Sequence, residues 1–210
     1  MRVVLASTSP RRRELLSLLR ISFEVVEPAF TEQIRSDLSP HEQACLFAEG
    51  KAQSCRLRFP DRLIIGSDTL IELNGKILGK PSNAAHAESM LKQLRGHEHM
   101  IQTAVAIVDS KIGSHKTAIE TVRVWFKPLS DDAVTRYVAT GESMGKAGAY
   151  AIQGAGGDLI ERIDGDYTAA VGLPLRRVAM MLQEEGVTIP ISIDTLYRAH
   201  AYPNWSRFAK

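Results

Sequence analysis

Short apolar runs alternate with amphipathic stretches through the first part of the chain, a pattern that predicts strands alternating with helices. The apolar run at residues 3–6 predicts a short buried strand. Pro10, a residue type favoured at the first helical position, predicts a helix that reaches about Leu19, with Ser9 as its N-cap. Residues 23–26 predict a second strand, so the chain opens with a strand, a helix and a strand.

The next segment carries clear signals for where elements begin and end. Residues 39–42 (SPHE) form a capping-box pattern with proline at the first helical position, which predicts a helix through Arg58. Residues 63–66 predict an apolar strand that ends in Ser67, Asp68 and Thr69. Asn74 and Gly75 are the residues most typical of a two-residue hairpin turn.

The second half adds an antiparallel component to this pattern. Its predicted elements are a helix from Asn83 to about Leu94, hairpin strands at 100–109 and 117–126, a helix capped by Ser130, and a last helix from Pro174 to about Gly186. Eight of the fifteen glycines lie between Gly141 and Gly172, which indicates tight turns. The predicted class is α/β, with a mixed twisted sheet flanked by helices.

Length and composition narrow the class of protein further. The 210 residues fit one large domain or two small lobes that share a cleft. Hydrophobic residues at 44% and charged residues at 24% exclude collagen-like, coiled-coil and disordered chains. The longest apolar run, 104–108, is far below the roughly 20 residues that a membrane helix needs. The apolar stretch at 3–6 is too short for a signal peptide, so we expect a cytoplasmic protein without a membrane partner.

The distribution of charge is more informative than its sum. The net charge of +2 by itself predicts no polyanionic partner. However, Arg2, Arg11, Arg12 and Arg13 precede the first acid, Glu14. Each cation in the first turn of a helix should cost roughly 0.3–1 kcal/mol. A phosphate bound at that helix end would reverse this cost, whereas arginines that point into solvent or pair with surface acids would leave the cost in place.

Asp68 is the best candidate for an acid that acts with these arginines. Open α/β sheets bind ligands at the carboxyl ends of their strands, where the pattern places Asp68, although an aspartate there can also be a simple turn former. Mg²⁺ typically takes one or two carboxylates plus substrate oxygens. Phosphate-binding arginines with Asp68, and Glu32 as a second acid, would suit metal-assisted hydrolysis of a phosphoanhydride.

Two other segments lack the features of the ligand-binding motifs that they resemble. Residues 141–147 (GESMGKA) resemble a phosphate-binding P-loop, but the segment is one residue short and has alanine in place of the Mg²⁺-binding hydroxyl residue. His97 and His99 lack the spacing of a helical metal-ligand pair, and we interpret them as part of a solvated turn.

Several ordered motifs resemble those of the Maf family of nucleoside triphosphate pyrophosphatases. The matching segments are 5–12 (LASTSPRR), 13–16 (RELL), 51–52 (KA), 66–69 (GSDT), 79–81 (GKP), 146–154 (KAGAYAIQG) and 171–175 (VGLPL). The resemblance covers residues 1–186, which we expect to form a single domain. The pattern does not predict the structure of the C-terminal tail, residues 187–210. The tail could pack on the body, stay disordered, or use its aromatic residues to contact a partner or nucleic acid.

The resemblance implies a two-lobed fold with a deep substrate groove, like that of inosine triphosphate pyrophosphatases, and a homodimer. It implies an enzyme that splits a nucleoside triphosphate into the monophosphate and pyrophosphate with a divalent cation, Mg²⁺, Mn²⁺ or Co²⁺. Asp68 would be the catalytic acid, and Asp68 and Glu32 would hold the metal. The residues expected to bind the phosphates are Ser7, Ser9, Arg12, Lys51 and Lys80.

Three positions resemble the branch of the family that acts on dTTP and UTP, namely Arg11, Thr69 and Gln153. A side-chain amide such as that of Gln153 can both donate to and accept from a pyrimidine edge. The alternatives are a pyrophosphatase for 7-methyl-GTP or for modified pyrimidine nucleotides, and a non-enzymatic regulator of cell division that binds nucleotide or nucleic acid. The chain departs from the family pattern at Thr31, where an acid is usual, and at Gly50, which should loosen the placement of Lys51.

Overall fold

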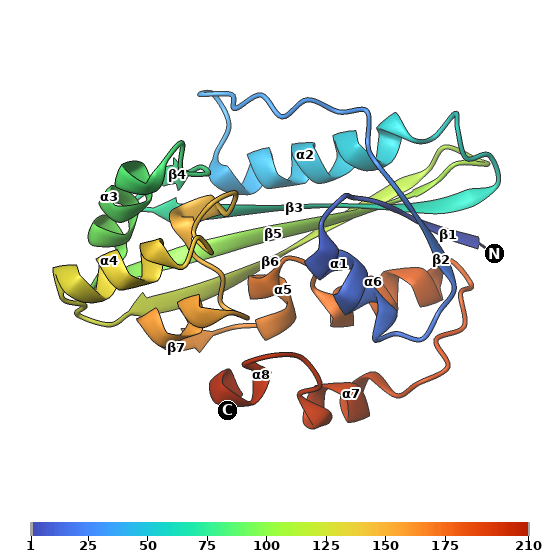
Figure 1. Ribbon diagram of the computed structural model, residues 1–210. Coiled ribbons are helices and arrows are strands. Elements are labelled where there is room, and N and C mark those ends of the chain that lie inside the picture. Colours follow the sequence, from blue (N-terminus) through green and yellow to red (C-terminus); the bar gives the residue numbers. More distant parts are fainter. Residues whose placement is uncertain (1, 210) are drawn as a thin grey trace.

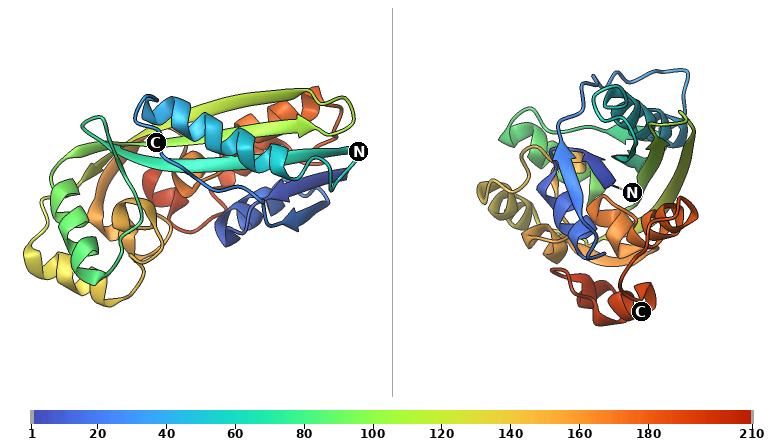
Figure 2. Two further views of the ribbon diagram at one scale, coloured as in Figure 1. Left: turned by 90° about the horizontal axis from the view of Figure 1, so that it is seen from above. Right: turned by 90° about the vertical axis from the view of Figure 1, so that its right-hand side faces the viewer.

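A computed structural model describes residues 2–209 and shows an elongated molecule built on a seven-stranded mixed sheet (Figures 1 and 2). The strand order is β2-β1-β3-β5-β6-β7, and β4 pairs with β3 outside this path. The strands are β1 (Arg2–Ala6), β2 (Phe23–Val26), β3 (Arg62–Leu73), β4 (Lys76–Leu78), β5 (Glu98–Asp109), β6 (His115–Phe126) and β7 (Ile160–Asp164). The predicted α/β class with a mixed sheet is confirmed.

Helices cover both faces and one end of this sheet (Figure 1). Helix α2 crosses one face, α1, α5 and α6 lie on the other, and α3 and α4 lie at the end far from the N-terminus. The helices are α1 (Pro10–Ser17), α2 (Pro40–Ser54), α3 (Ala84–Leu94), α4 (Asp131–Ala139), α5 (Tyr167–Val171), α6 (Leu175–Glu184), α7 (Ile193–Ala199) and α8 (Trp205–Phe208). Two short 3-10 helices, η1 (Ala147–Ala149) and η2 (Ala155–Leu159), lie in the glycine-rich segment.

Alternating side chains of the central strands divide the core into two layers. Val4 and Ile64 belong to the apolar cluster under α2, whereas Val3 and Leu5 belong to the larger cluster on the opposite face. This division follows from the two-residue period of a strand, which sends successive side chains to opposite faces. The apolar runs that predicted the central strands β1 and β3 are therefore buried on both sides, as is usual where parallel strands meet, whereas the edge strand β2 is largely exposed.

Strand β3 differs from its prediction and changes the setting of Asp68. The strand does not end at Gly66 but continues through Asp68 to Leu73. Its first part pairs in parallel with β1 as far as the pair of Ala6 with Gly66, while residues 63–72 pair antiparallel with β5. Asp68 thus lies inside a strand, just beyond the carboxyl end of β1, and the long antiparallel partner explains why the strand continues past its polar residues.

The predicted element boundaries hold to within a few residues elsewhere. The capping box at Ser39 is present, and the hairpin turn at Asn74 and Gly75 has both residues at positive φ. Helix α2 ends at Ser54 rather than near Arg58, because tight turns follow it. None of the helices that the structure describes is long and apolar enough to cross a membrane.

One further prediction, that of Ser9 as an N-cap, is confirmed in position only, and another, that of His99, is wrong. The Ser9 side chain occupies the N-cap position but makes no capping hydrogen bond, and its own N–H donates to the Ser7 hydroxyl at 3.2 Å. His99 does not lie in a solvated turn: its side chain is buried in β5, where its Nε2 lies 2.7 Å from the Tyr150 hydroxyl. The strand begins two residues earlier than its apolar pattern predicted, which takes His99 into the core.

Candidate active site

Two hollows on the surface have volumes of about 760 and 930 Å³. The larger one, which we call the groove, is lined by every site residue that the sequence predicted. These residues are Ser7, Ser9, Arg11, Arg12, Glu32, Lys51, Asp68, Thr69, Lys80 and Gln153. They come from the β1–α1 loop, the first turn of α1, the β2–α2 loop, α2, β3, the β4–α3 loop and the η1–η2 loop, so the groove exists only because the sheet brings distant segments together.

Lys51 joins two carboxylates inside this groove. Its Nζ lies 2.5 Å from Asp68 Oδ1 and 2.5 Å from Glu32 Oε1. Lys51 and Asp68 are both more than nine-tenths buried, whereas the Glu32 side chain is 42% exposed. Burial raises the pKa of Asp68 and the charges of Lys51 and Arg12 partly oppose it. Burial also acts on Glu32, but the hydrogen bond and charge of Lys51 outweigh it and lower the pKa of that carboxyl.

The two carboxylates fit a divalent cation. Asp68 Oδ2 is a buried oxygen without a hydrogen-bond partner among the residues described, so it has a free coordination position. Glu32 supplies a second carboxylate at the same ammonium group. Residues 2–209 contain no cluster of three or more histidine, cysteine, aspartate or glutamate side chains that could enclose a metal. One or two carboxylates with substrate oxygens are, however, the usual ligands of Mg²⁺.

Arg12 ties three segments of the groove together. Its Nε donates to Gly172 O at 2.9 Å, and its terminal nitrogens donate to Thr69 Oγ1 at 3.2 Å and to Ser7 Oγ at 3.5 Å. Burial lowers the pKa of Arg12 and also that of Arg11, since both guanidinium groups have lost part of their water. Half-buried cations at the N-terminus of α1 favour an anionic ligand.

The Gln153 side chain faces the groove with an unused acceptor. Gln153 lies between η1 and η2, and its Oε1 is buried with no hydrogen-bond partner among the described residues. A buried amide oxygen without a partner is costly, so this position is suited to a ligand that donates a hydrogen bond.

Glu142 and Tyr137 hold the backbone of this loop and were missed from the sequence. Glu142 Oε2 accepts from Gly156 N at 2.8 Å and from the Tyr137 hydroxyl at 2.8 Å. The Tyr137 hydroxyl in turn accepts from Ala151 N at 3.2 Å. Residues 141–147 were set aside because they fail as a P-loop, and only the high glycine content nearby signalled that this segment builds a site.

Lys146 also lines the groove and was not predicted. Burial lowers its pKa, and the charge of Arg11 acts in the same direction. Lys80 lies in the groove as an exposed side chain, and its charge helps to lower the pKa of Glu32. The groove is lined by five cations and four acids: Arg11, Arg12, Lys51, Lys80 and Lys146, and Glu27, Glu32, Asp68 and Glu142. The arginine and lysine side chains are the charge-assisted donors that a polyphosphate requires.

Comparisons with known proteins agree with this geometry. The family model described as Maf-like protein matches residues 2–185. A protein of Pelotomaculum thermopropionicum named dTTP/UTP pyrophosphatase is 44% identical over 187 residues, which cover 89% of this chain and 98% of that protein. A protein of Methylobacillus flagellatus with the same name is 42% identical and covers 92% of this chain and 97% of its own length. The solved structure of a HAM1 protein from Coxiella burnetii has a TM-score of 0.51 at 15% identity, covering 88% of this chain and 99% of that one, and shares the fold. With its family motifs gathered in one groove and its match spanning residues 2–185, the chain belongs to the Maf family.

Proposed function

We propose that this protein hydrolyses dTTP and UTP to the monophosphate and pyrophosphate with the help of a divalent cation. The single observation that carries the proposal is the Lys51 ammonium between Asp68 and Glu32 in a groove lined by arginines. The names of the relatives support the same activity.

The chain's own residues account for each part of the reaction. Asp68 orients a water molecule toward the α-phosphorus and accepts its proton. As the new oxygen–phosphorus bond forms, the bond from the α-phosphorus to the bridging oxygen breaks, and pyrophosphate leaves with that electron pair. A divalent cation held by Asp68 and Glu32 would neutralise charge on the triphosphate when bound.

The cations and helix end of the groove hold the triphosphate in place. Arg11 and Arg12 project from the first turn of α1, and Lys51 and Lys80 face the same groove. The hydroxyls of the β1–α1 loop, those of Ser7 and Ser9, add neutral donors there. Hydrogen bonds and ion pairs hold Arg12 and Lys51 in place before the substrate arrives, so these two cations stabilise developing negative charge with little reorganisation, which is electrostatic rather than covalent catalysis.

Gln153 is the residue that we assign to base recognition, with Arg11 and Thr69 as its companions. Its unpartnered Oε1 can accept from the N3–H of uracil or thymine, and its amide nitrogen can donate to a carbonyl of the same ring. The protein is further expected to act as a homodimer on the nucleotide pool of the cytoplasm.

A release assay over a panel of nucleotides tests this function. The protein is incubated with dTTP, UTP, 7-methyl-GTP and purine triphosphates in Mg²⁺, Mn²⁺ or Co²⁺, and monophosphate and pyrophosphate are measured. We expect equal amounts of both products, a preference for dTTP and UTP, and loss of turnover when EDTA removes the cation. A preference for 7-methyl-GTP would reassign the substrate, and binding of DNA with steep salt dependence but no hydrolysis would reject the enzyme.

A further inference from the structure

The C-terminal tail, residues 187–210, lies wholly beyond the part of the chain that the family model matches. The structure describes it up to residue 209 and shows it folded on the body, with two helices, α7 and α8 (Figure 1). One of its side chains contacts the loop that carries Gln153, and this contact is the basis of the inference.

Asn204 bonds to the backbone on both sides of Gln153. Its Nδ2 donates to Ile152 O at 2.9 Å and to Gly154 O at 2.9 Å. Both hydrogens of one amide group are therefore used on the two carbonyls that flank the specificity residue. The approach is close, since a Cβ added at Gly157 would lie 2.6 Å from the same nitrogen.

The backbone around Asn204 is fixed so that the amide points at the loop. Asn204 has a φ of 61°, a left-handed conformation that asparagine tolerates better than most residues. The carbonyl of the preceding residue, Pro203, accepts a hydrogen bond from the Tyr167 hydroxyl. The following residue, Trp205, is 3% exposed and stacks on Tyr167 with ring centres 5.8 Å apart.

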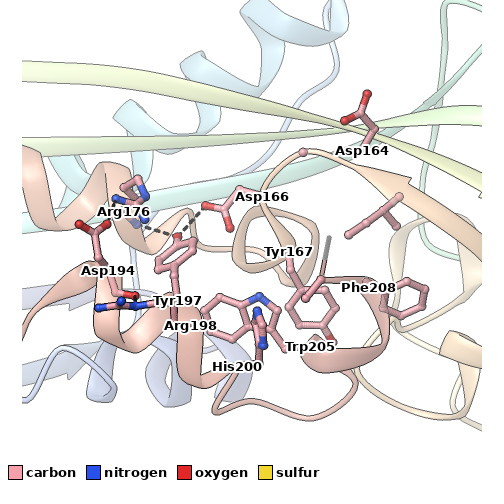
Figure 3. A pocket seen from close by; sticks show the side chains of 13 residues that line it. Asp164, Asp166, Tyr167, Arg176, Asp194, Tyr197, Arg198, His200, Trp205 and Phe208 are labelled. Carbon is pink, nitrogen blue, oxygen red and sulfur yellow. Dashed lines mark hydrogen bonds and ion pairs between the residues drawn. The ribbon is translucent and has the colours of Figure 1, made fainter.

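A second anchor holds the other tail helix against α5 and α6. The Tyr197 hydroxyl donates to Asp166 Oδ2 at 2.8 Å and accepts from Arg176 N at 2.9 Å. Its ring meets the edge of Trp205 at 5.0 Å between centres, so the two anchors are in contact (Figure 3). The tail is thus attached through buried aromatic rings and directed hydrogen bonds rather than through surface charges alone.

We propose that Asn204 is a positioning residue for base recognition, and that the tail acts through it to keep the Gln153 loop in its substrate-binding shape. The inference rests on the proposed function, because it assigns to the tail a role in the selectivity of that same groove. The Glu142 carboxylate accepts hydrogen bonds from backbone N–H groups of the loop, and the Asn204 amide donates to backbone carbonyls of the loop. Without Asn204, the loop is held only by the contacts of its N–H groups with Glu142 and Tyr137, so we expect the whole loop to open more often.

Two variants remove the amide donors in different ways. Asn204→Gly deletes the side chain and accepts the positive φ, while Asn204→Asp keeps the shape but places an oxygen against two carbonyls. The matched control is Ser192→Ala, which removes the cap at Thr195 N of α7 without touching the loop.

Steady-state kinetics on dTTP, UTP and a purine triphosphate provide the first readout. We expect both Asn204 variants to raise KM for dTTP about tenfold while kcat changes less than about twofold. The ratio of kcat/KM for dTTP to kcat/KM for the purine triphosphate should therefore fall. Ser192→Ala should leave that ratio unchanged even if it lowers the melting temperature. An unaltered ratio in both Asn204 variants, or an equal change in Ser192→Ala, would overturn the inference.

Hydrogen exchange provides a readout that does not need catalysis. Amides of residues 151–157 should exchange faster in both Asn204 variants than in the parent protein, while those of α2 and β3 stay protected. Unchanged exchange in this loop contradicts the inference whether or not the protein is active. If the parent protein hydrolyses no triphosphate, the proposed function fails, and the exchange result alone decides whether Asn204 restrains the loop.

Discussion

In the groove, the contacts of single charged side chains matter more than the net charge of the protein. The whole chain has a net charge of only +2, yet Lys51 meets two carboxylates and Arg12 bonds to three different segments. Of the N-terminal arginines, Arg2 and Arg13 are exposed, whereas Arg11 and Arg12 line the groove. The excess of positive charge near the N-terminus therefore consists of two surface arginines and two groove arginines. Only the two in the groove are placed to bind a small anionic substrate.

Gln153→Glu tests base recognition at the scale of a single residue. The change replaces the amide donor with a carboxylate, which cannot donate to a pyrimidine carbonyl and repels the approaching anion. We expect kcat/KM for dTTP to fall at least about tenfold and the ratio of dTTP to 7-methyl-GTP turnover to change. The same substitution at the exposed Gln183, Gln183→Glu, is the control and should leave the ratio as it was. An unchanged ratio in Gln153→Glu would remove this residue from the specificity site.

His99 predicts how stability depends on pH. Burial lowers the pKa of His99 from 6.5 to about 3, so the folded protein keeps the ring neutral while the unfolded chain takes up a proton. Stability is therefore fully present above pH 6.5 and is lost as the pH falls toward 3, by up to about 1.4 kcal/mol per pH unit.

The variant His99→Gln keeps a polar partner for the Tyr150 hydroxyl but cannot titrate. Urea unfolding at about pH 7.5 and about pH 5 should show the parent losing roughly 2 kcal/mol more than the variant. Equal losses in the two proteins would show that His99 does not make this contribution.

At the scale of elements, the site depends on how closely α2 approaches β3. A Cβ added at Gly66 would lie 2.1 Å from Ala48 O and 2.8 Å from Ala52 N, so only glycine allows this contact between helix and strand. Lys51 precedes Ala52 and Asp68 follows Gly66 by two residues, so the same contact fixes the ion pair. Gly50, which the sequence suggested would loosen Lys51, instead makes room for the ring of Phe30, since a Cβ there would lie 2.1 Å from its Cε2.

Gly66→Ala should separate the two elements. The methyl group has to push backbone atoms apart, at a cost of about 1–3 kcal/mol in the free energy of unfolding. The shift would also lengthen the contact of Lys51 with Asp68, and we expect kcat/KM to fall by about a hundredfold. Gly79→Ala is a control for stability alone, because nothing lies within 4 Å of a Cβ at that position but Gly79 lines the groove beside Lys80. Denaturant unfolding of both variants and pyrophosphate release by Gly66→Ala measure the two effects, and equal unfolding of the two variants or unchanged release by Gly66→Ala would contradict this interpretation.

Local signals predicted the elements well, and tertiary pairing explains where they failed. Capping at Ser39, Asn83 and Ser130 marked the starts of α2, α3 and α4, because each side chain bonds to a backbone N–H three residues on. The full length of β3 could not be read from its own residues, since Ser67 and Asp68 look like a strand end and stay in the sheet only through pairing with β5.

The sequence likewise predicted some residues of the candidate site, whereas others come near the site only through folding. The family motifs predicted the residues that line the groove, Asp68 and Gln153 among them. They did not predict Glu142 or Asn204, whose contacts with the Gln153 loop span from 13 to 52 residues of sequence. Asn204 occupies the N-cap position of α8, but its side chain bonds to the distant loop instead of capping that helix, and only the folded structure reveals such a contact.

At the scale of the whole molecule, one sheet provides both the rigidity and the groove. The parallel pairing of β1 with β3 ends at Gly66. Strand β3 continues beyond it, paired antiparallel with β5, and places Asp68 at the groove. Helix α2 on one face and α1 on the other bring Lys51 and the arginines to this point. The central claim is that this arrangement hydrolyses the α–β phosphoanhydride through Asp68.

The most direct test compares pyrophosphate and monophosphate release from dTTP by the parent protein and by Asp68→Asn. Asparagine keeps the size of the side chain but removes the charge and the proton acceptor, so we predict that release of both products falls by at least about a thousandfold. Circular dichroism should show the same fold in both proteins. Turnover near the parent rate in a folded Asp68→Asn protein would contradict the account.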